Sequence, residues 1–246
     1  MKKIFKIMLL SGLLISITFC NRGEDRYMKY MVNRINDNIT VDANWDKPQW
    51  QKVKAITLKN YMGEKPLFWP NTQIKMLYND NAIYVIFKVE DRYVKAVAKH
   101  INDKIYRDSC VEFFFTPGNN ISQGYFNLEV NCGGMPYFGF QKGFKKDVVK
   151  IDIADIKKIK IAHSLPQTIE QEIQEPITWT VEYKIPIKML EKYTEVAIPQ
   201  SDVCWRANFY KTADATSNPH YITWNKVNNQ TPNFHLPRFF GELIFK

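Results

Sequence analysis

Two expected β-strands carry the polar side chains with the clearest chemical potential. Alternation of side chains places Glu112 on one face of the strand 110–116, and it places Glu129 and Asn131 on one face of the strand 125–132. Carboxylate and amide groups in the middle of a sheet are costly to bury without hydrogen-bond partners. A sugar supplies such partners because each of its hydroxyl groups both donates and accepts. The pattern therefore predicts a face that binds carbohydrate.

The same carboxylates raise the question of catalysis. Glu112 and Glu129 would fall on neighbouring strands, and a pair of carboxylates can hydrolyse glycosidic bonds. However, the chain has no G-x-S-x-G, H-E-x-x-H, phosphate-loop or dinucleotide-binding pattern, and its four histidines show no metal-ligand spacing. We therefore interpret the carboxylates as hydrogen-bonding groups and predict a protein that is not an enzyme. A divergent glycoside hydrolase stays open as an alternative.

Aromatic residues make up 14% of the chain and can cover the apolar face of a sugar ring. Trp69 in the loop 67–70 is one candidate for such stacking. His235 is expected instead to form local hydrogen bonds that fix the C-terminal loop. Four other tryptophans are expected in the core: Trp45, Trp50, Trp179 and Trp205.

The elements that must position these side chains show a dominant period of two, which is typical of strands. Short alternating or apolar segments are separated by turn signals such as Asn79-Asp80-Asn81. We expect an all-β sandwich of antiparallel strands in a single domain over residues 21–246, with part of 21–38 joining a sheet. Short helices are expected at 44–51 and 186–193. The expected strands are 74–78, 83–89, 110–116, 125–132, 136–140, 157–163, 178–185, 205–211 and 239–245.

The N-terminus reads as an export signal over residues 1–20. Three lysines precede an apolar run at 7–17 that is too short to span a bilayer comfortably. Cys20 closes this run and is followed by polar residues, as at the lipidation site of a bacterial lipoprotein. We therefore expect an exported protein, periplasmic or at the outer membrane or cell surface, attached to the membrane through a lipid on Cys20.

The positive net charge does not indicate nucleic-acid binding. Without the three lysines of the export signal, the net charge falls from +9 to about +6, and the remaining lysines are scattered. No stripe of Lys and Arg interleaves with aromatic residues. We expect no nucleic-acid partner.

Three cysteines remain after the export signal, an odd number that does not make a disulfide framework. We interpret Cys110, Cys132 and Cys204 as buried free thiols, and one disulfide among the three stays open.

Five segments in order resemble the family 9 carbohydrate-binding modules and their standalone relatives. The resemblance covers about residues 28–246. The segments are I-T-V-D-A-N-W-D-K-P-Q-W (39–50), I-Y-V-I-F-K-V-E-D (83–91), Y-R-D-S-C-V-E-F-F (106–114), Y-F-N-L-E-V-N (125–131), and Y-I-T-W (221–224) with F-H-L-P-R-F-F-G (234–241).

The resemblance implies an immunoglobulin-like β-sandwich in which two aromatic rings clamp a sugar and polar groups bind its hydroxyls. It places the clamp at Trp224 and Tyr106, and glutamate and asparagine contacts at Glu112 and Asn131. Glu129 stands where the family pattern has arginine. Arg107 and Asp108, in the motif that begins at Tyr106, complete the expected carbohydrate-binding set. Some members hold structural calcium, for which Asp91 is the candidate here, and no other cofactor is implied.

The leading hypothesis is therefore non-catalytic capture of an oligo- or polysaccharide at the cell envelope, in support of polysaccharide-degrading enzymes or transporters. The alternative from a different class is a haem-binding electron-transfer sandwich. That function needs a pair of axial ligands, and Met135 and His163 are residues of the required types.

Overall fold

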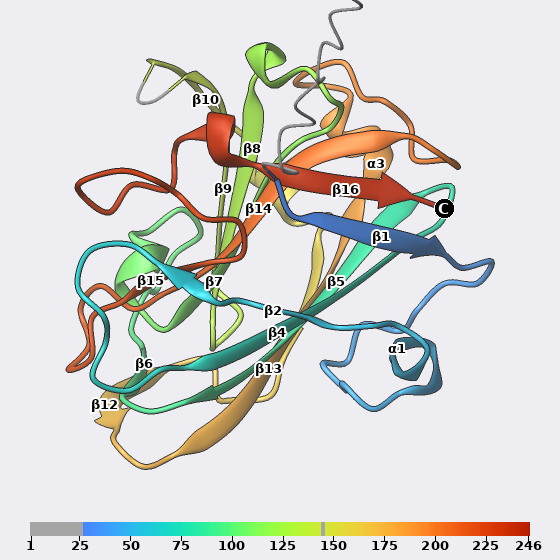
Figure 1. The fold of residues 1–246 in the computed structure, drawn as a ribbon. Helices are drawn as coiled ribbons and strands as arrows, with labels where there is room; N and C mark the ends of the chain where they lie inside the picture. Colours follow the sequence, from blue (N-terminus) through green and yellow to red (C-terminus); the bar gives the residue numbers. More distant parts are fainter. Residues whose placement is uncertain (1–26, 144–145) are drawn as a thin grey trace, which may run out of the picture.

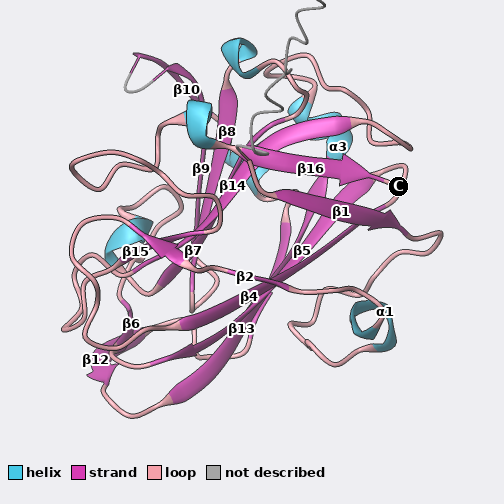
Figure 2. Cartoon of the chain, viewed as in Figure 1, coloured by secondary structure: helices cyan, strands magenta, loops and turns pink. Residues whose placement is uncertain are grey.

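The computed structural model of the chain describes residues 27–143 and 146–246 (Figure 1). The expected export signal and Cys20 lie outside the described residues. No helix in the described part of the chain is long and apolar enough to cross a membrane. Strands make up most of the regular secondary structure, with a few single-turn helices and long loops between them (Figure 2).

Two sheets form the sandwich. The first has the strand order β10-β9-β8-β7-β14-β16-β1, and the second has the order β1-β4-β5-β13-β11. In the first the strands are β10 (Lys146–Lys150), β9 (Pro136–Gly143), β8 (Tyr125–Asn131), β7 (Cys110–Thr116), β14 (Cys204–Thr212) and β16 (Gly241–Phe245). In the second they are β4 (Asn71–Tyr78), β5 (Ala82–Asp91), β13 (Ile177–Pro186) and β11 (Lys160–His163).

The strand β1 (Lys29–Arg34) belongs to both sheets. Its first half pairs with β16, its end pairs with β4, and both pairings are parallel. The other strand pairs of the structure are antiparallel as expected, and β1 is the exception because it has no hairpin partner and instead closes the seam between the sheets (Figure 1). The expectation that part of 21–38 joins a sheet is confirmed.

Short elements complete the fold. The helices are α1 (Pro48–Gln51), α2 (Ile153–Ile156) and α3 (Ile187–Leu190), with single 3₁₀ turns η1 (Ile105–Arg107), η2 (Ile121–Gln123) and η3 (Pro237–Phe239). The remaining strands are β2 (Ile56–Thr57), β3 (Asn60–Tyr61), β6 (Val94–Ala96), β12 (Ile169–Ile173) and β15 (Tyr221–Thr223). The expected strand at 157–163 is shorter because α2 and its C-terminal turn precede it.

The main core lies between the two sheets and is rich in aromatic rings. Phe113 on β7 stacks on Phe209 of β14 with ring centroids 4.8 Å apart, and Phe115 stacks on Trp205 at 5.6 Å. Full burial of one such side chain contributes about 1.5–3 kcal/mol, so this layer fixes the registers of β7 and β14. Trp50, Trp179 and Trp205 are fully buried here as expected, whereas Trp45 is only partly buried.

A second apolar cluster covers the outer face of the first sheet. It joins Phe114 on β7, Tyr125 on β8 and Tyr210 on β14 to the segment 226–240 that follows β15, through Val227, Phe234 and Phe240. Tyr210 and Phe234 stack with ring centroids 4.0 Å apart. The segment 226–240 is therefore held over the sheet face that carries the polar row predicted from alternation.

The three cysteines are free. Cys110 and Cys132 are buried as expected, while Cys204 is half-buried. Burial raises the pKa of the Cys132 thiol to about 12, so this thiol is unreactive at neutral pH.

Candidate functional site

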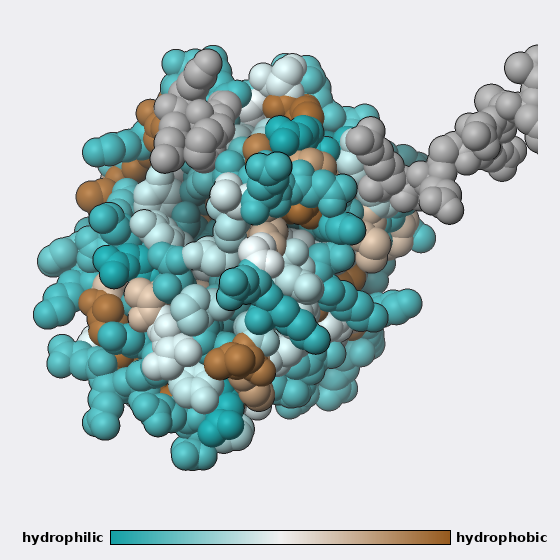
Figure 3. Space-filling view, turned by 60° about the vertical axis from the view of Figure 1, so that its left-hand side comes forward, coloured by the Kyte–Doolittle hydropathy of each residue, from teal (hydrophilic) through white to brown (hydrophobic). Residues whose placement is uncertain are grey.

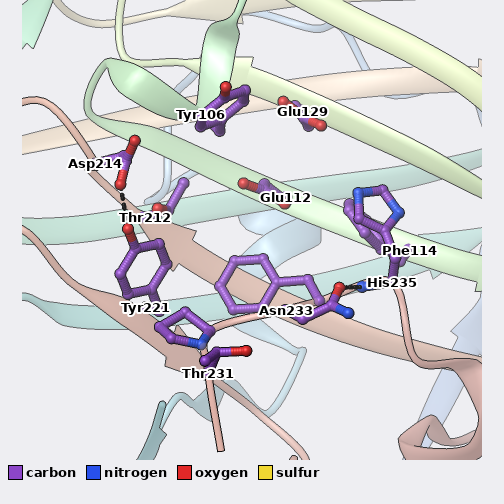
Figure 4. Close-up of a pocket in the computed structure, with 12 residues that line it drawn as sticks. Tyr106, Glu112, Phe114, Glu129, Thr212, Asp214, Tyr221, Thr231, Asn233 and His235 are labelled. Carbon is purple, nitrogen blue, oxygen red and sulfur yellow. Dashed lines mark hydrogen bonds between the residues drawn. The ribbon is translucent and has the colours of Figure 1, made fainter. Parts of the chain in front are cut away.

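A pocket lies on the outer face of the first sheet, over β7, β8 and β14 (Figure 4). Its cavity of about 480 Å³ falls in the range of small-molecule sites, which runs from about 300 to 1,000 Å³. The segment 231–235 forms one wall of it. The lining residues are Tyr106, Glu112, Phe114, Glu129, Thr212, Asp214, Tyr221, Thr231, Pro232, Asn233, Phe234 and His235.

Two carboxylates form the floor of the pocket. Glu112 on β7 and Glu129 on β8 are directly opposed in the antiparallel register, so their side chains rise from the same face as neighbours. Glu129 accepts a hydrogen bond from the Asn127 amide at 3.2 Å. Glu112 is only 2% exposed, and no group among the described residues hydrogen-bonds to it. Its carboxylate points into the cavity, between Tyr106 and Tyr221 in Figure 4.

The environment of these carboxylates favours their protonated forms. Burial, and then the charge of Glu129, raises the pKa of the Glu112 carboxyl well above its usual range. Burial likewise raises the pKa of Glu129 to about 7, against the lowering effect of the hydrogen bond from Asn127. Near neutral pH the empty pocket therefore holds at least one proton on the pair.

Two tyrosines stand on either side of the floor and are linked through Asp214. Tyr106, in η1, is 40% exposed, and its carbonyl oxygen accepts a hydrogen bond from the backbone N–H of Asp214 at 3.1 Å. The Tyr221 hydroxyl donates to the Asp214 carboxylate (Figure 4). Burial and this carboxylate raise the pKa of Tyr221 to about 12, so the phenol stays a donor. The two rings are thus held at fixed positions, ready to contact a ligand.

His235 fixes the wall of the pocket. Its ring Nδ1 lies 2.9 Å from the Tyr125 hydroxyl oxygen, and its backbone N–H donates to the Asn233 side chain at 2.9 Å. The expectation that His235 bonds locally and orders the C-terminal loop agrees with these contacts. The imidazole also lines the cavity, so it is available as a ligand contact.

Of the residues predicted from sequence, the structure brings Tyr106, Glu112 and Glu129 together in this pocket. It does not bring Trp224 there. The Trp224 side chain is 2% exposed and packs in the main core against Phe209, with ring centroids 5.7 Å apart. The prediction of Trp224 as a sugar clamp is therefore corrected to a core role in this structure.

Three further predicted residues do not line the pocket. One oxygen of the buried Asp108 carboxylate accepts hydrogen bonds from the backbone N–H groups of Val97 and Ala98, each at 3.0 Å, and from Asn131. Arg107 is exposed and lines a different cavity with Asp108. None of Arg107, Asp108 and Asn131 lines the Glu112 pocket. The hydrogen bonds of Asp108 and Asn131 position η1 and the nearby turns, whereas a sugar contact by the exposed Arg107 stays a prediction.

Asn131 holds the turn after β8. Its side-chain oxygen accepts from the backbone N–H groups of Gly133 and Met135 at 3.1 and 2.8 Å, and its amide donates to Asp108 at 2.8 Å. We expect Asn131→Ala to lower the free energy of unfolding by about 2 kcal/mol, because buried donors lose their partner. Urea denaturation measures the change. Asn36→Ala, at an exposed site, is the control, and a loss of ligand affinity without loss of stability would contradict the structural role.

Trp69 and Asp91 make contacts with the rest of the fold and lie outside the pocket. Trp69 is partly buried against the main core and meets the ring of Tyr61 edge-on at 6.0 Å, away from the Glu112 pocket. The buried Asp91 carboxylate lies 3.2 Å from the Lys211 ammonium and accepts from Trp179 Nε1 at 3.4 Å. An ammonium thus balances the charge of Asp91, which does not fit the expected calcium ligand. Within residues 27–143 and 146–246, no group of three or more His, Cys, Asp and Glu could hold a metal ion.

Several pocket residues were not predicted. They are Tyr221, Asp214, Thr212 and the wall residues of 231–235. One signal was present: alternation along 221–224 puts Ile222 and Trp224 on one face and Tyr221 on the other. Since Ile222 is fully buried, the ring available to a ligand is that of Tyr221. The sequence of the wall, residues 231–235, shows no hydrophobic periodicity from which its position in the fold could be predicted.

A β-sandwich with an aromatic-sided, carboxylate-floored pocket on one sheet face has the form of a carbohydrate-binding module. The sequence profile described as carbohydrate-binding family 9 matches residues 39–245. The chain belongs to carbohydrate-binding family 9.

Solved structures share this fold. A protein from Bacteroides uniformis ATCC 8492, to which carbohydrate binding is ascribed, superposes with a TM-score of 0.80 at 22% identity, over 89% of this chain and 100% of that one. A family 9 module from Caldicellulosiruptor kristjanssonii superposes with a TM-score of 0.61 at 18% identity, over 89% of this chain. That module was solved with glucose and with cellotriose, and 96% and 94% of its chain are covered.

A curated relative comes from the fungus Arthroderma benhamiae (strain ATCC MYA-4681 / CBS 112371). It is described as an extracellular protein and is 25% identical over 195 residues, which cover 76% of this chain and 83% of the relative. The β-sandwich predicted from alternation and from the resemblance is thus confirmed by family and by fold.

Proposed function

We propose that the chain binds carbohydrate, without turning it over, in the pocket between Tyr106 and Tyr221. The main support for this proposal is the Glu112 carboxylate, which is buried at the bottom of an open cavity and has no hydrogen-bond partner among the described residues. A buried polar group of this kind is stabilised when a ligand completes its hydrogen bonds. The glucose and cellotriose complexes of the Caldicellulosiruptor kristjanssonii module support a sugar as that ligand.

The arrangement explains how a sugar ring would be held. The flat faces of Tyr106 and Tyr221 cover apolar C–H groups, while Glu112, Glu129 and Asn233 offer acceptors and donors to hydroxyls. Each hydrogen bond contributes only about 0.5–1.5 kcal/mol net because the hydroxyls give up water. A monosaccharide is therefore expected to bind weakly, and a longer glycan more tightly.

The floor geometry favours binding over hydrolysis. Glycoside hydrolases place two carboxyl groups on either side of the scissile bond. Glu112 and Glu129 are register partners on adjacent strands, so both approach a ligand from the same side. Incubation with mixed polysaccharides should release no reducing sugar, and measurable release would support the hydrolase alternative.

The haem alternative receives no support from the residues that it needs. Met135 packs against Ile105 and Cys110, and the His163 ring bonds through Nδ1 to the carbonyl oxygen of Leu165 at 2.6 Å. Neither residue lines the pocket. A Soret band in the purified protein would reverse this conclusion.

Export and attachment to the cell envelope are part of the proposal. The apolar run before Cys20 and the extracellular relative support export, and Cys20 is the proposed lipidation site. A position in the periplasm, or at the outer membrane or cell surface, would place the pocket near polysaccharide-degrading enzymes or transporters as partners. Metabolic labelling with a fatty-acid analogue, compared with Cys20→Ser, tests the attachment.

Tyr106→Ala tests the pocket directly. Loss of the stacked ring should weaken cellotriose binding about tenfold, which corresponds to 1.4 kcal/mol of apolar burial and contact. Isothermal titration calorimetry measures the affinity. Tyr61→Ala is the matched control, since Tyr61 is an exposed tyrosine outside the pocket. Equal loss in both variants would remove the assignment of the pocket, and failure of the wild type to bind any glycan would remove the proposed function.

A further inference from the structure

The carboxylates that line the pocket have no lysine or arginine among them to balance their negative charge. The three carboxylates are those of Glu112, Glu129 and Asp214. The chain is basic nevertheless, with a net charge of about +6 when the three lysines of the expected export signal are left out. The surface in Figure 3, where the left-hand side of Figure 1 comes forward, is mostly hydrophilic with small separate hydrophobic patches. An acidic pocket in a basic protein points to selection of charge by the site rather than by the whole surface.

The carboxylates differ in the partners that they have. Asp214 accepts from Tyr221, and Glu129 has donors in the Asn127 side chain and the backbone N–H of Tyr106, but Glu112 has no hydrogen bond among the described residues. The cation whose charge acts on Glu112 is Lys211. Its ammonium instead bonds to Asp91 and His220 and does not line the pocket. The charge of the floor pair is therefore left for a ligand to compensate.

An ammonium group suits this floor better than a neutral hydroxyl. It carries a full positive charge and three donors, so it can bond to both carboxylates at once. A neutral hydroxyl donates only one hydrogen bond and leaves two neighbouring acids that repel each other when ionised. The tyrosine faces on either side also attract a cation through their π-systems.

We infer that the pocket selects a glycan with free amino groups, an amino sugar whose ammonium lies between Glu112 and Glu129. The inference rests on the proposed function, because it names the class of sugar for the same site. Glu129 decides this selectivity, since it adds the second carboxylate at the position where the family resemblance implied arginine.

Binding of an ammonium would be coupled to proton release. The empty pair holds at least one proton near neutral pH, and a cation favours the fully ionised pair. The affinity for an amino sugar should therefore rise as the pH rises from 5 through the pKa of Glu129 near 7, for as long as the amine stays protonated. The affinity for a neutral sugar should not rise over this range.

The experiment compares three β-1,4-linked trimers of equal length by isothermal titration calorimetry at pH 6, where the amines are protonated and the carboxyl pair still holds a proton. They are the glucosamine trimer with free amines, its fully N-acetylated form, and cellotriose. We expect the free-amine trimer to bind at least tenfold more tightly than both neutral trimers. Titrations in two buffers of different ionisation enthalpy should show proton release only with the free-amine trimer. Glu129→Gln should shrink the tenfold preference to threefold or less.

The outcomes separate this inference from the proposed function. If cellotriose or the N-acetylated trimer binds as tightly as the free-amine trimer, the inference is overturned and the proposed function stands. If none of the three trimers binds, and a wider glycan panel also fails, both are overturned. Circular dichroism of Glu129→Gln must match the wild type, and if it does not, Glu129→Asp, which keeps the charge, is tested for retention of the preference.

Discussion

Replacing Glu112 with leucine is expected to weaken sugar binding strongly while making the folded protein more stable. The ligand loses a carboxylate partner at the centre of the floor, and the site gains an apolar group that cannot accept a hydrogen bond. Hydrogen bonds to charged groups contribute about 1.5–3 kcal/mol, so affinity should fall by about 30-fold or more. Calorimetric titration of the variant with the best wild-type ligand measures this loss.

The gain in stability follows from the cost of burying the carboxyl. Burial raises the pKa of Glu112 well above 4.5 in the folded protein, so the folded state keeps a proton that the unfolded chain releases. The wild type therefore loses stability as the pH rises above about 4.5, while leucine has no such group. We expect Glu112→Leu to raise the free energy of unfolding by about 1–3 kcal/mol at pH 8, and by less at pH 5.

Glu191→Leu is the matched control because Glu191 is exposed and does not line the pocket. It should change neither affinity nor the pH dependence of stability. If Glu112→Leu retains full affinity, the carboxylate is not a ligand contact. If its stability falls at pH 8, Glu112 stabilises the fold and is not a strained group held for a ligand.

Lys211→Met should lower the free energy of unfolding by about 3–5 kcal/mol, the cost of leaving a buried charge without its partner. The Lys211 ammonium lies 3.2 Å from the Asp91 carboxylate and 2.7 Å from His220 Nε2, and all three side chains are buried. His220 Nδ1 is engaged by the Asn218 carbonyl oxygen at 2.7 Å. Burial, and then the charge of Lys211, lowers the pKa of His220 well below its usual value, so the neutral ring accepts from the ammonium.

Guanidinium denaturation followed by tryptophan fluorescence measures this effect. Arg34→Met is the control, because it removes an even closer ion pair, at 2.6 Å from Asp80, in which both side chains are exposed. Exposed pairs contribute about 0–1 kcal/mol. A Lys211→Met variant no less stable than Arg34→Met would show that the buried network is not needed. The double variant Lys211→Met, Asp91→Leu should recover part of the loss, since no lone carboxylate remains.

Alternation along single strands predicted a large part of the site. A period of two placed Glu112 and Glu129 on the same face of neighbouring strands, and their direct opposition in the structure confirms it. The same rule placed Val111 and Val130 in the core, where both are buried. This success has a simple cause, because a strand's facing depends only on its own sequence once one face is buried.

The clamp at Trp224 shows where a motif misleads. Its position in the segment Tyr221–Trp224 suggested a ligand contact. However, side chains alternate between the two faces of the sheet, so Trp224 and Ile222 lie in the core and Tyr221 lies in the pocket. Likewise Asn131 has the residue type of a ligand contact, yet it hydrogen-bonds to the turn at Gly133. Residue type was correct in both cases, and the direction of the side chain decided the role.

The pocket wall could not have been predicted from local pattern. Residues 231–235 are placed by long-range contacts, such as the stacking of Phe234 on Tyr210 and the contact of His235 with Tyr125. The parallel pairing of β1 is equally hard to predict, because no hairpin turn in the sequence indicates which strands it pairs with. Both features depend on surfaces that exist only once the sandwich has formed.

The placement of β1 has a mechanical consequence. Tension on the chain ahead of residue 27 would enter the fold through this strand. Its first half is hydrogen-bonded to β16 and its end to β4. Peeling it away would break ladders in both sheets. From β16 the load passes to β14 and then to β7, the strand that carries Glu112. A domain held by its N-terminus against a moving polymer would therefore carry the strain through continuous hydrogen-bonded ladders rather than through its loops.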